Sequence, residues 1–110
     1  MAISKLKLSG STDGKGILLP TVATPGTLIH TAHATSLDEI WIYAANFDSV
    51  DRELTIEFGE AAQNIIVGVP NQEGLIQVIP GFILTNSLIV RAYADVTNKV
   101  YIFGWVHRVS

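Results

Sequence analysis

The sequence contains no cysteine, which excludes disulfide bonds, zinc sites built on thiolates and thiol catalysis for this chain. Charge is also scarce, because only 15% of the residues are Asp, Glu, Lys or Arg, against about 25% in ordinary soluble domains. No apolar run approaches the roughly 18 residues that a membrane helix requires. The alternating residues 1–7 do not form the apolar core of a secretory signal. We therefore expect no membrane association and a protein that is made in a cytoplasm.

Motifs that carry catalysis or ligand binding are missing as well. The glycine-rich segment 10–16 has neither the glycine spacing nor the Ser or Thr after lysine that a phosphate-binding loop needs. His30 and His33 are three residues apart on a predicted strand and should point to opposite faces. Glu53 and Glu57 would stand roughly 13 Å apart along a strand, too far for a pair of glycosidase carboxylates. We predict no enzymatic activity, no cofactor and no metal site.

The residues that are present favour an all-β domain. Apolar residues make up 48% of the chain, and most of them fall in short segments separated by turn residues such as Asp13-Gly14, Pro25-Gly26 and Pro80-Gly81. No stretch has a sustained helical period. Eight or nine strands at spacings near 10 residues indicate an antiparallel two-sheet sandwich of jelly-roll-like type. Closure into a small barrel is the alternative.

A single domain is expected over residues 1–110, since a chain of this length has room for only one core. Within it, residues 1–9 form a possible N-terminal arm or an edge strand. The turn residues predict two hairpins and one segment that crosses between the sheets. The hairpins pair Asn64–Val69 with residues 75–79 and residues 88–95 with residues 99–109, and the crossing segment covers residues 82–87.

Several predicted strands are apolar on both faces. Residues 40–45 carry aliphatic side chains on one face, with Trp41 and Tyr43 on the other. By contrast, residues 53–58 alternate, so that Glu53 and Glu57 are predicted to face water. An apolar outer face needs cover, and the most economical cover is another protein chain. The candidate aromatic residues for self-association are Trp41, Tyr43, Tyr101, Phe103 and Trp105. Gly104, which lies between Phe103 and Trp105 in the sequence, predicts a bulge or a close approach by another backbone.

The charges are distributed unevenly along the chain. Seven acidic residues and one arginine between positions 38 and 60 give that segment a net charge of −6. Residues 1–37 hold three lysines and one aspartate, and Lys5 and Lys7 lie in the predicted arm. The two regions could pair between neighbouring subunits, or they could be separate solvated faces. An acidic chain with 7 Lys and Arg residues predicts no nucleic-acid binding.

A family resemblance rests on strand and turn patterns over most of the chain. The segments PGTLIHTA, LDEIWIYAAN, LTIEFG, VIPGFIL and YIFGWV resemble parts of small β-rich virion proteins of tailed bacteriophages, of the capsid decoration (cement) type. The resemblance implies a homo-oligomer, a trimer in the favoured case, that binds the phage major capsid protein and stabilises the shell. It implies localisation in the virion after assembly in the host cytoplasm. It brings no catalytic residues.

Within this hypothesis, Lys5 and Lys7 contact a neighbouring subunit or the capsid, while the aromatic faces of the two apolar strands serve trimerisation. Two other functions remain open on the sequence alone. A neck or tail component of the virion would share the self-association but form a ring. A carbohydrate-binding module would turn its aromatic rings outward.

Overall fold

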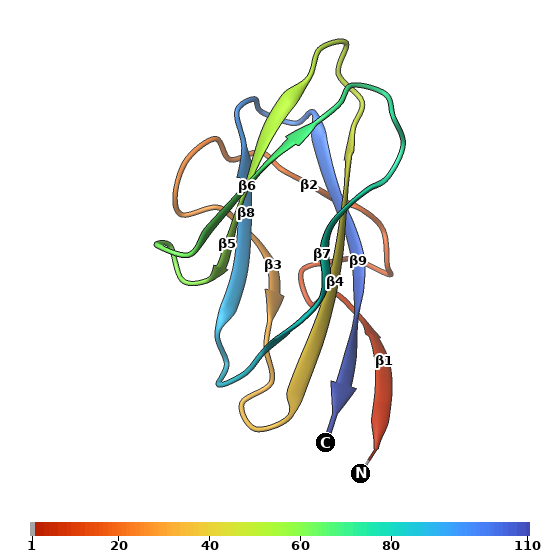
Figure 1. Cartoon of the computed structure of the whole chain (residues 1–110), viewed down its shortest axis with the longest axis vertical. Helices are drawn as coiled ribbons and strands as arrows, with labels where there is room; N and C mark the ends of the chain where they lie inside the picture. Colours follow the sequence, from red (N-terminus) through yellow and green to blue (C-terminus); the bar gives the residue numbers. More distant parts are fainter. Residues whose placement is uncertain (1) are drawn as a thin grey trace.

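The computed structural model describes residues 2–110 as nine strands in two antiparallel sheets that pack face to face (Figure 1). The predicted sandwich is confirmed. Between residues 2 and 110 the sheets do not close into a barrel, and no helix is long and apolar enough to cross a membrane. Met1, the first residue of the predicted arm, lies outside the described residues. The strands are β1 (Ile3–Lys7), β2 (Ile17–Leu18), β3 (Thr27–Thr31), β4 (Leu37–Asn46), β5 (Arg52–Gly59), β6 (Asn64–Val69), β7 (Ile76–Leu84), β8 (Ile89–Ala94) and β9 (Val100–Val109).

The strand pairing is nested about the β5–β6 connection. Antiparallel pairs form between β5 and β6, β4 and β7, β3 and β8, and β2 and β9. Two further pairings, β4 with β9 and β5 with β8, join these pairs into sheets. The five-stranded sheet has the order β1-β9-β4-β7, with β2 also on β9, and the four-stranded sheet has the order β3-β8-β5-β6. A long hairpin rolled up in this way is a jelly roll.

Both predicted hairpins are wrong. β6 and β7 lie in different sheets, and so do β8 and β9. The short connections after Val69 and after Ala94 carry the chain from one sheet to the other, a step of about 10 Å between packed sheets. Turn residues and strand periodicity indicate where strands end, but they do not indicate which strand is the partner.

The predicted crossing segment 82–87 is also wrong over its first half. β7 runs through Pro80 and Gly81 and pairs with β4 as far as Leu84, with two register shifts along the way. Proline is tolerated here because β7 is an edge strand, where a missing N–H costs no ladder bond. Gly81 has a φ of 82°, in the left-handed region that favours glycine.

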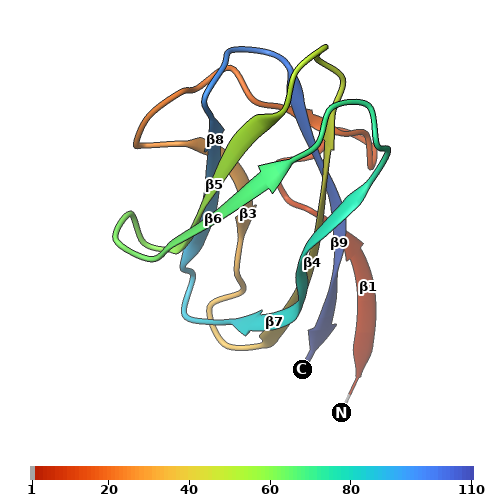
Figure 2. The same ribbon diagram turned by 45° about the horizontal axis from the view of Figure 1, so that its top comes forward.

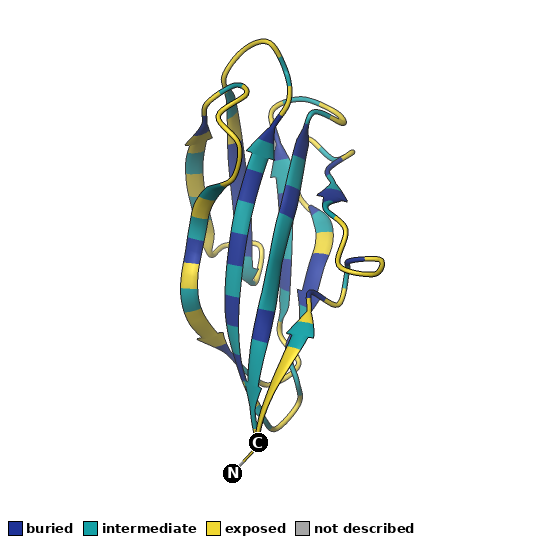
Figure 3. Ribbon diagram, turned by 90° about the vertical axis from the view of Figure 1, so that its right-hand side faces the viewer, coloured by how far each residue is buried: buried dark blue, intermediate teal, exposed yellow. Residues whose placement is uncertain are grey.

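The core lies between the sheets and is built from alternate residues of the central strands. Along β4, every second residue from Asp38 to Asn46 is buried while the residues between them are partly exposed. Figure 3 shows this alternation as bands along the two central strands of the five-stranded sheet. The largest fully buried apolar side chains are Leu8, Leu19, Ile29, Ile40, Ile42, Leu54, Ile56, Ile79, Ile102 and Val69.

β5 departs from the expected pattern at one position. Glu53 is exposed as predicted, but Glu57 is only 2% exposed, so the prediction that it faces water is wrong. The loop before β3 folds over the outer face of the four-stranded sheet at this point. The backbone N–H of Gly26 donates to Glu57 Oε1 at 2.7 Å, and the Thr24 hydroxyl donates to the other oxygen. These bonds compensate for the loss of water around a buried carboxylate.

Gly104 confirms the expected close approach of two backbones. A Cβ atom at this position would lie 2.0 Å from the carbonyl oxygen of Trp41 on the neighbouring strand β4. Real Cβ atoms do not come so near a backbone oxygen, so any side chain here forces β4 and β9 apart.

We therefore expect Gly104→Ala to lower the free energy of unfolding by about 3 kcal/mol, at the upper end of the cost of overpacking. Gly68→Ala in the edge strand β6 is the control, because a Cβ there meets nothing within 4 Å. Urea unfolding followed by tryptophan fluorescence measures both. Equal stability of the two variants would contradict this account of Gly104.

Candidate interface on the five-stranded sheet

The aromatic residues predicted from two separate strands lie on one surface. β4 and β9 pair with Trp41 opposite Trp105, Tyr43 opposite Phe103, and Ala45 opposite Tyr101. Residues directly opposite each other in an antiparallel pair point to the same face of the sheet, and here that is the face away from the core. We call this surface the aromatic face. It consists of Trp41, Tyr43, Phe47, Tyr101, Phe103 and Trp105.

The rings of the aromatic face contact one another in two groups of three. Trp105 stacks with Trp41 at a centroid distance of 5.5 Å and an interplanar angle of 9°, and with Tyr43 at 5.7 Å and 19°. Tyr101 contacts Phe103 at 6.0 Å and Phe47 at 5.4 Å. The five predicted aromatic residues are each half-buried in the isolated chain. The two groups meet where Tyr43 lies opposite Phe103 in the ladder, so the aromatic residues form one strip along β4 and β9.

Phe47 belongs to this strip although it was not among the predicted interface residues. Its side chain is 47% exposed, and the ammonium of Lys99 lies 5.4 Å from the centre of its ring. Phe47 follows β4 directly and continues the two-residue spacing of Trp41, Tyr43 and Ala45. That spacing was the signal in the sequence that could have identified it.

Both indole N–H groups are bound within the chain. Trp41 Nε1 donates to Glu39 Oε1 at 2.9 Å, and Trp105 Nε1 donates to His107 Nε2 at 3.2 Å. Because Nε2 of His107 accepts, the neutral ring carries its proton on Nδ1, which lies 3.5 Å from the same Glu39 oxygen. Three polar contacts thus link the four side chains in a row from one indole ring to the other, and the two rings stack on each other.

Lys5 and Lys7 lie beside the aromatic face. In the β1–β9 ladder Lys5 is opposite His107 and Lys7 is opposite Trp105, and the ladder continues to a backbone pair between Ala2 and Ser110. Residues 3–7 are therefore an edge strand in this structure, one of the two forms expected for the N-terminal segment. Both lysines are exposed, and Lys7 Nζ donates to the carbonyl of Ser11 at 3.0 Å.

A pocket of about 280 Å³ lies on the outer side of the other sheet. Its lining includes Glu57, Arg91, Pro25, Leu88 and Ile89. The Glu57 oxygens accept hydrogen bonds from the loop above them, and the Arg91 guanidinium donates to the carbonyl of Gly26 at 3.4 Å. Within residues 2–110 no group of three or more His, Cys, Asp or Glu side chains is arranged to hold a metal ion.

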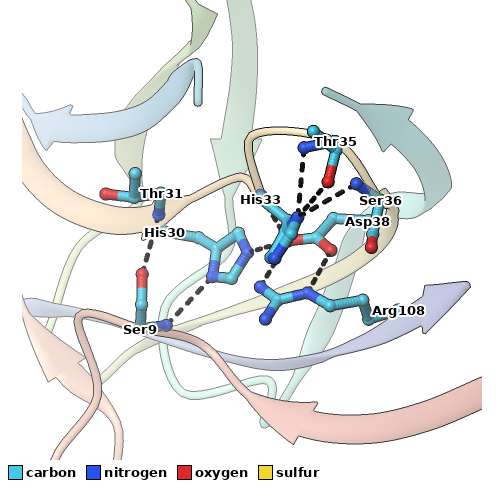
Figure 4. Close-up of polar contacts among 8 residues, drawn as sticks. All are labelled: Ser9, His30, Thr31, His33, Thr35, Ser36, Asp38 and Arg108. Atoms are coloured by element: carbon cyan, nitrogen blue, oxygen red, sulfur yellow. Dashed lines mark hydrogen bonds and ion pairs between the residues drawn. The ribbon is translucent and has the colours of Figure 1, made fainter. Parts of the chain in front are cut away.

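A buried polar cluster at one end of the sandwich was not predicted (Figure 4). The Asp38 carboxylate is fully buried and accepts hydrogen bonds from Arg108 Nε at 2.7 Å and Arg108 Nη2 at 2.9 Å. His30 Nε2 lies 2.8 Å from the same carboxylate, and its other nitrogen, Nδ1, accepts the backbone N–H of Ser9 at 3.0 Å. His30 is therefore the neutral tautomer that carries its proton on Nε2.

The environment of the cluster fixes its protonation state. Burial by itself raises the pKa of Asp38, but the hydrogen bonds from Arg108, His30 and the backbone of His33 outweigh burial and lower that pKa to about 2. Burial lowers the pKa of His30 below its ordinary value of 6.5, against the opposing effect of the hydrogen bond to Asp38. The cluster thus holds an aspartate anion, an arginine cation and a neutral histidine.

The geometry of the cluster does not match a catalytic triad. In a triad the serine hydroxyl bonds to the histidine, but here Ser9 contacts His30 through its backbone N–H. The Ser9 hydroxyl oxygen instead accepts the N–H of Thr31 at 2.7 Å. His30 is 1% exposed and Asp38 is 0% exposed, so no substrate reaches them. The cluster ties β3, β4 and β9 to the loop that follows β1.

Comparison with protein-family models, with curated proteins and with solved structures finds no match.

Asp38→Asn should lower the free energy of unfolding at pH 7 by about 3 kcal/mol, since it leaves a half-buried arginine without its anionic partner. Thermal or urea unfolding measures the loss. The control is Asp13→Asn, because Asp13 is exposed in a turn at a φ of 57° that asparagine also adopts.

The variant should also change the dependence of stability on pH. A folded-state pKa of about 2 against an ordinary 3.8 stabilises the fold above pH 4, and this contribution is lost as the pH falls toward 2. The lowered pKa of His30 adds a loss that begins near its ordinary value of 6.5. The difference in unfolding free energy between the parent and Asp38→Asn should therefore shrink below pH 4. A difference that stays constant from pH 7 to pH 2 contradicts the assigned charge state.

Proposed function

We propose that the chain is a non-enzymatic structural subunit that self-associates through the aromatic face, and that the assembly decorates and stabilises a phage head shell. The observation that carries the proposal is the aromatic face itself. It occupies the two central strands of the five-stranded sheet, and its rings lie partly open to solvent in the isolated chain. A continuous apolar surface rich in Trp and Tyr is typical of the centre of a protein–protein interface.

The size of the face sets the strength of one contact. Five rows of outward residues, from the Leu37–Val109 pair to the Ala45–Tyr101 pair, span about 27 Å along the strands and roughly 15 Å across the sheet. The projected area of about 400 Å² is half of the ~800 Å² per partner in a standard interface. The aromatic face therefore supports association but needs flanking contacts for a stable assembly.

Charge provides such flanking contacts. Lys5 and Lys7 border the aromatic face on β1, whereas the exposed acidic side chains Asp51 and Glu53 lie in or next to the β4–β5 connection. A contact in which the basic margin of one subunit meets the acidic loop of the next uses two different surfaces. Heterologous contacts of this kind close into rings when the rotation between subunits allows it. A trimer is the smallest such ring and is our favoured assembly.

The stabilising role follows from mass action. A subunit that binds one state of a shell and not another shifts the equilibrium toward the bound state by its binding free energy. The partner in this proposal is the phage major capsid protein, and the site of action is the virion. No catalytic group is required.

The aromatic face also bears on the two alternative functions. A sugar-binding platform presents flat ring faces to solvent, but Trp105 already stacks with both Trp41 and Tyr43, which reduces the ring surface available to a sugar. A neck or tail ring would use the same apolar face. The number of subunits in the assembly separates that function from a decoration trimer.

Sedimentation velocity at micromolar concentration tests the proposal, and we expect the parent chain to sediment as a trimer. Ala45→Lys should shift it to the monomer, because the new charge stands beside Tyr101 on the aromatic face without removing a ring. Thr97→Lys adds the same charge in an exposed loop and should leave the trimer intact. Unchanged circular dichroism would show that both variants fold.

Two results would overturn parts of the proposal. A parent chain that stays monomeric at micromolar concentration would remove self-association altogether. A larger closed ring would instead favour the neck or tail function.

A further inference from the structure

The four-stranded sheet ends in an edge strand with free backbone groups. β6 pairs with β5 on one side only and lies at the edge of the sheet (Figure 2). Among residues 2–110, the backbone groups of residues 64–68 form no hydrogen bond other than those of the β5–β6 ladder. The other side of β6 therefore presents unpaired donors and acceptors of the kind that attract another strand.

The phase of the ladder identifies these groups. The N–H of Phe58 donates to the carbonyl of Gln63 on the β6 side of β5, and the carbonyl of Glu53 accepts the N–H of Asp95 on the β8 side. Even-numbered residues of β5 therefore bond toward β6 and odd-numbered ones toward β8, as the alternation of an antiparallel ladder requires. In the β5–β6 register Ile56 is opposite Ile65. It follows that Asn64, Ile66 and Gly68 direct their N–H and C=O groups to the free side.

These three residues are complementary to a second copy of themselves. In an antiparallel β6–β6 pair centred on Ile66, each Ile66 exchanges two hydrogen bonds with its counterpart, and each Asn64 does the same with the opposite Gly68. All six outward groups of each strand are then satisfied. Ile65 faces Val67 of the other copy on the core side, so the apolar row continues across the contact. The Ile66 side chain, which is 62% exposed in the isolated chain, meets its counterpart on the outer face.

The other four edge strands carry features that discourage such pairing, and one of these features is the shortness of β2, which has only two residues. β1 holds Lys5 and Lys7, β7 contains Pro80 and two register shifts, and β3 has a register shift after Leu28. Edge lysines, prolines and bulges are the devices that protect natural sheets from edge-to-edge association. β6 has none of them, and no residue from 61 to 72 is charged.

We propose that two copies of the chain join through antiparallel pairing of their β6 edges, related by a two-fold axis at Ile66. The contact merges two four-stranded sheets into one continuous sheet. A ladder of five residues is too small to hold a dimer by itself at low concentration. The inference therefore rests on the proposed self-association through the aromatic face, because a ring carries several β6 edges and can make more than one such contact at once.

A single introduced cysteine tests the pairing, because the chain has none of its own. Opposed residues of a hydrogen-bonded antiparallel pair have Cα atoms about 5.5 Å apart, within the range that a disulfide spans. Ile66→Cys should cross-link two chains under mild oxidation on the order of ten-fold faster than Val22→Cys. Val22 is the matched control because it is 53% exposed in the loop before β3 and belongs neither to β6 nor to the aromatic face.

A second substitution in the Ile66→Cys chain tests whether the backbone ladder is responsible. Gly68→Pro removes an outward N–H from β6 without touching a β5–β6 bond, and proline is tolerated on the free side of an edge strand. It should abolish the rapid cross-linking. Gly68→Ala keeps the N–H, meets nothing within 4 Å, and should leave the rate unchanged. Circular dichroism verifies that each chain is folded.

The outcomes separate this inference from the proposed function. Equal cross-linking rates for Ile66→Cys and Val22→Cys, or no effect of Gly68→Pro, overturn β6 pairing even when the parent chain is a trimer. Selective cross-linking at position 66 in a chain that sediments as a monomer, with Ala45→Lys having no effect, supports β6 pairing and removes the aromatic face instead.

Discussion

The ladder between β4 and β9 is the interaction on which the rest of the structure depends. It runs without a register shift through ten residue pairs, from Leu37 opposite Val109 to Asn46 opposite Val100. Its inward residues supply much of the core, and its outward residues form most of the aromatic face. The two strands come close together near the middle of the ladder because Gly104 has no side chain to keep the backbone of Trp41 away. Core and candidate interface are thus two sides of the same pair of strands.

Such a ladder needs a device that fixes its register, because a slip of one residue exchanges the two faces of a strand. Asp38 and Arg108 provide it. They are directly opposite in the ladder and form a buried ion pair at its end. A slip would separate the pair and turn Asp38 toward solvent while it turned Trp41 into the core. Buried ion pairs add little net stability but strongly disfavour arrangements that break them, so this pair acts chiefly on register.

Local chemistry explains which features of this fold the sequence could predict. Short apolar segments rich in β-branched and aromatic residues, such as 40–45 and 99–109, predict strands, and the absence of helical periods excludes an α-rich fold. The partners of the strands were mispredicted, because β8 and β9 carry apolar faces that suit either a hairpin or two separate sheets. The burial of Glu57 could not be predicted from neighbouring residues either. The loop that covers it comes from a distant segment of the chain, at Thr24 and Gly26.

In the candidate site, too, local features could be predicted from the sequence and long-range contacts could not. The five aromatic residues were identified from two-residue spacing, which is local, but their union into one surface depends on the pairing of β4 with β9. The cluster of His30, Asp38 and Arg108 spans 78 positions of the chain and has no local signature. Its members look like three unrelated polar residues in the sequence. Only the three-dimensional arrangement shows that one carboxylate organises the other two side chains.

The two proposed contacts lie on different sheets, and this placement determines what kind of assembly they can build together. A two-fold β6 contact alone gives a closed dimer to which no third copy can bind in the same way. A heterologous contact at the aromatic face alone closes into a ring. A subunit with both contacts belongs to a ring through the five-stranded sheet and can link to a neighbouring ring through the four-stranded sheet. Rings linked edge to edge in this way extend over a surface instead of closing on themselves.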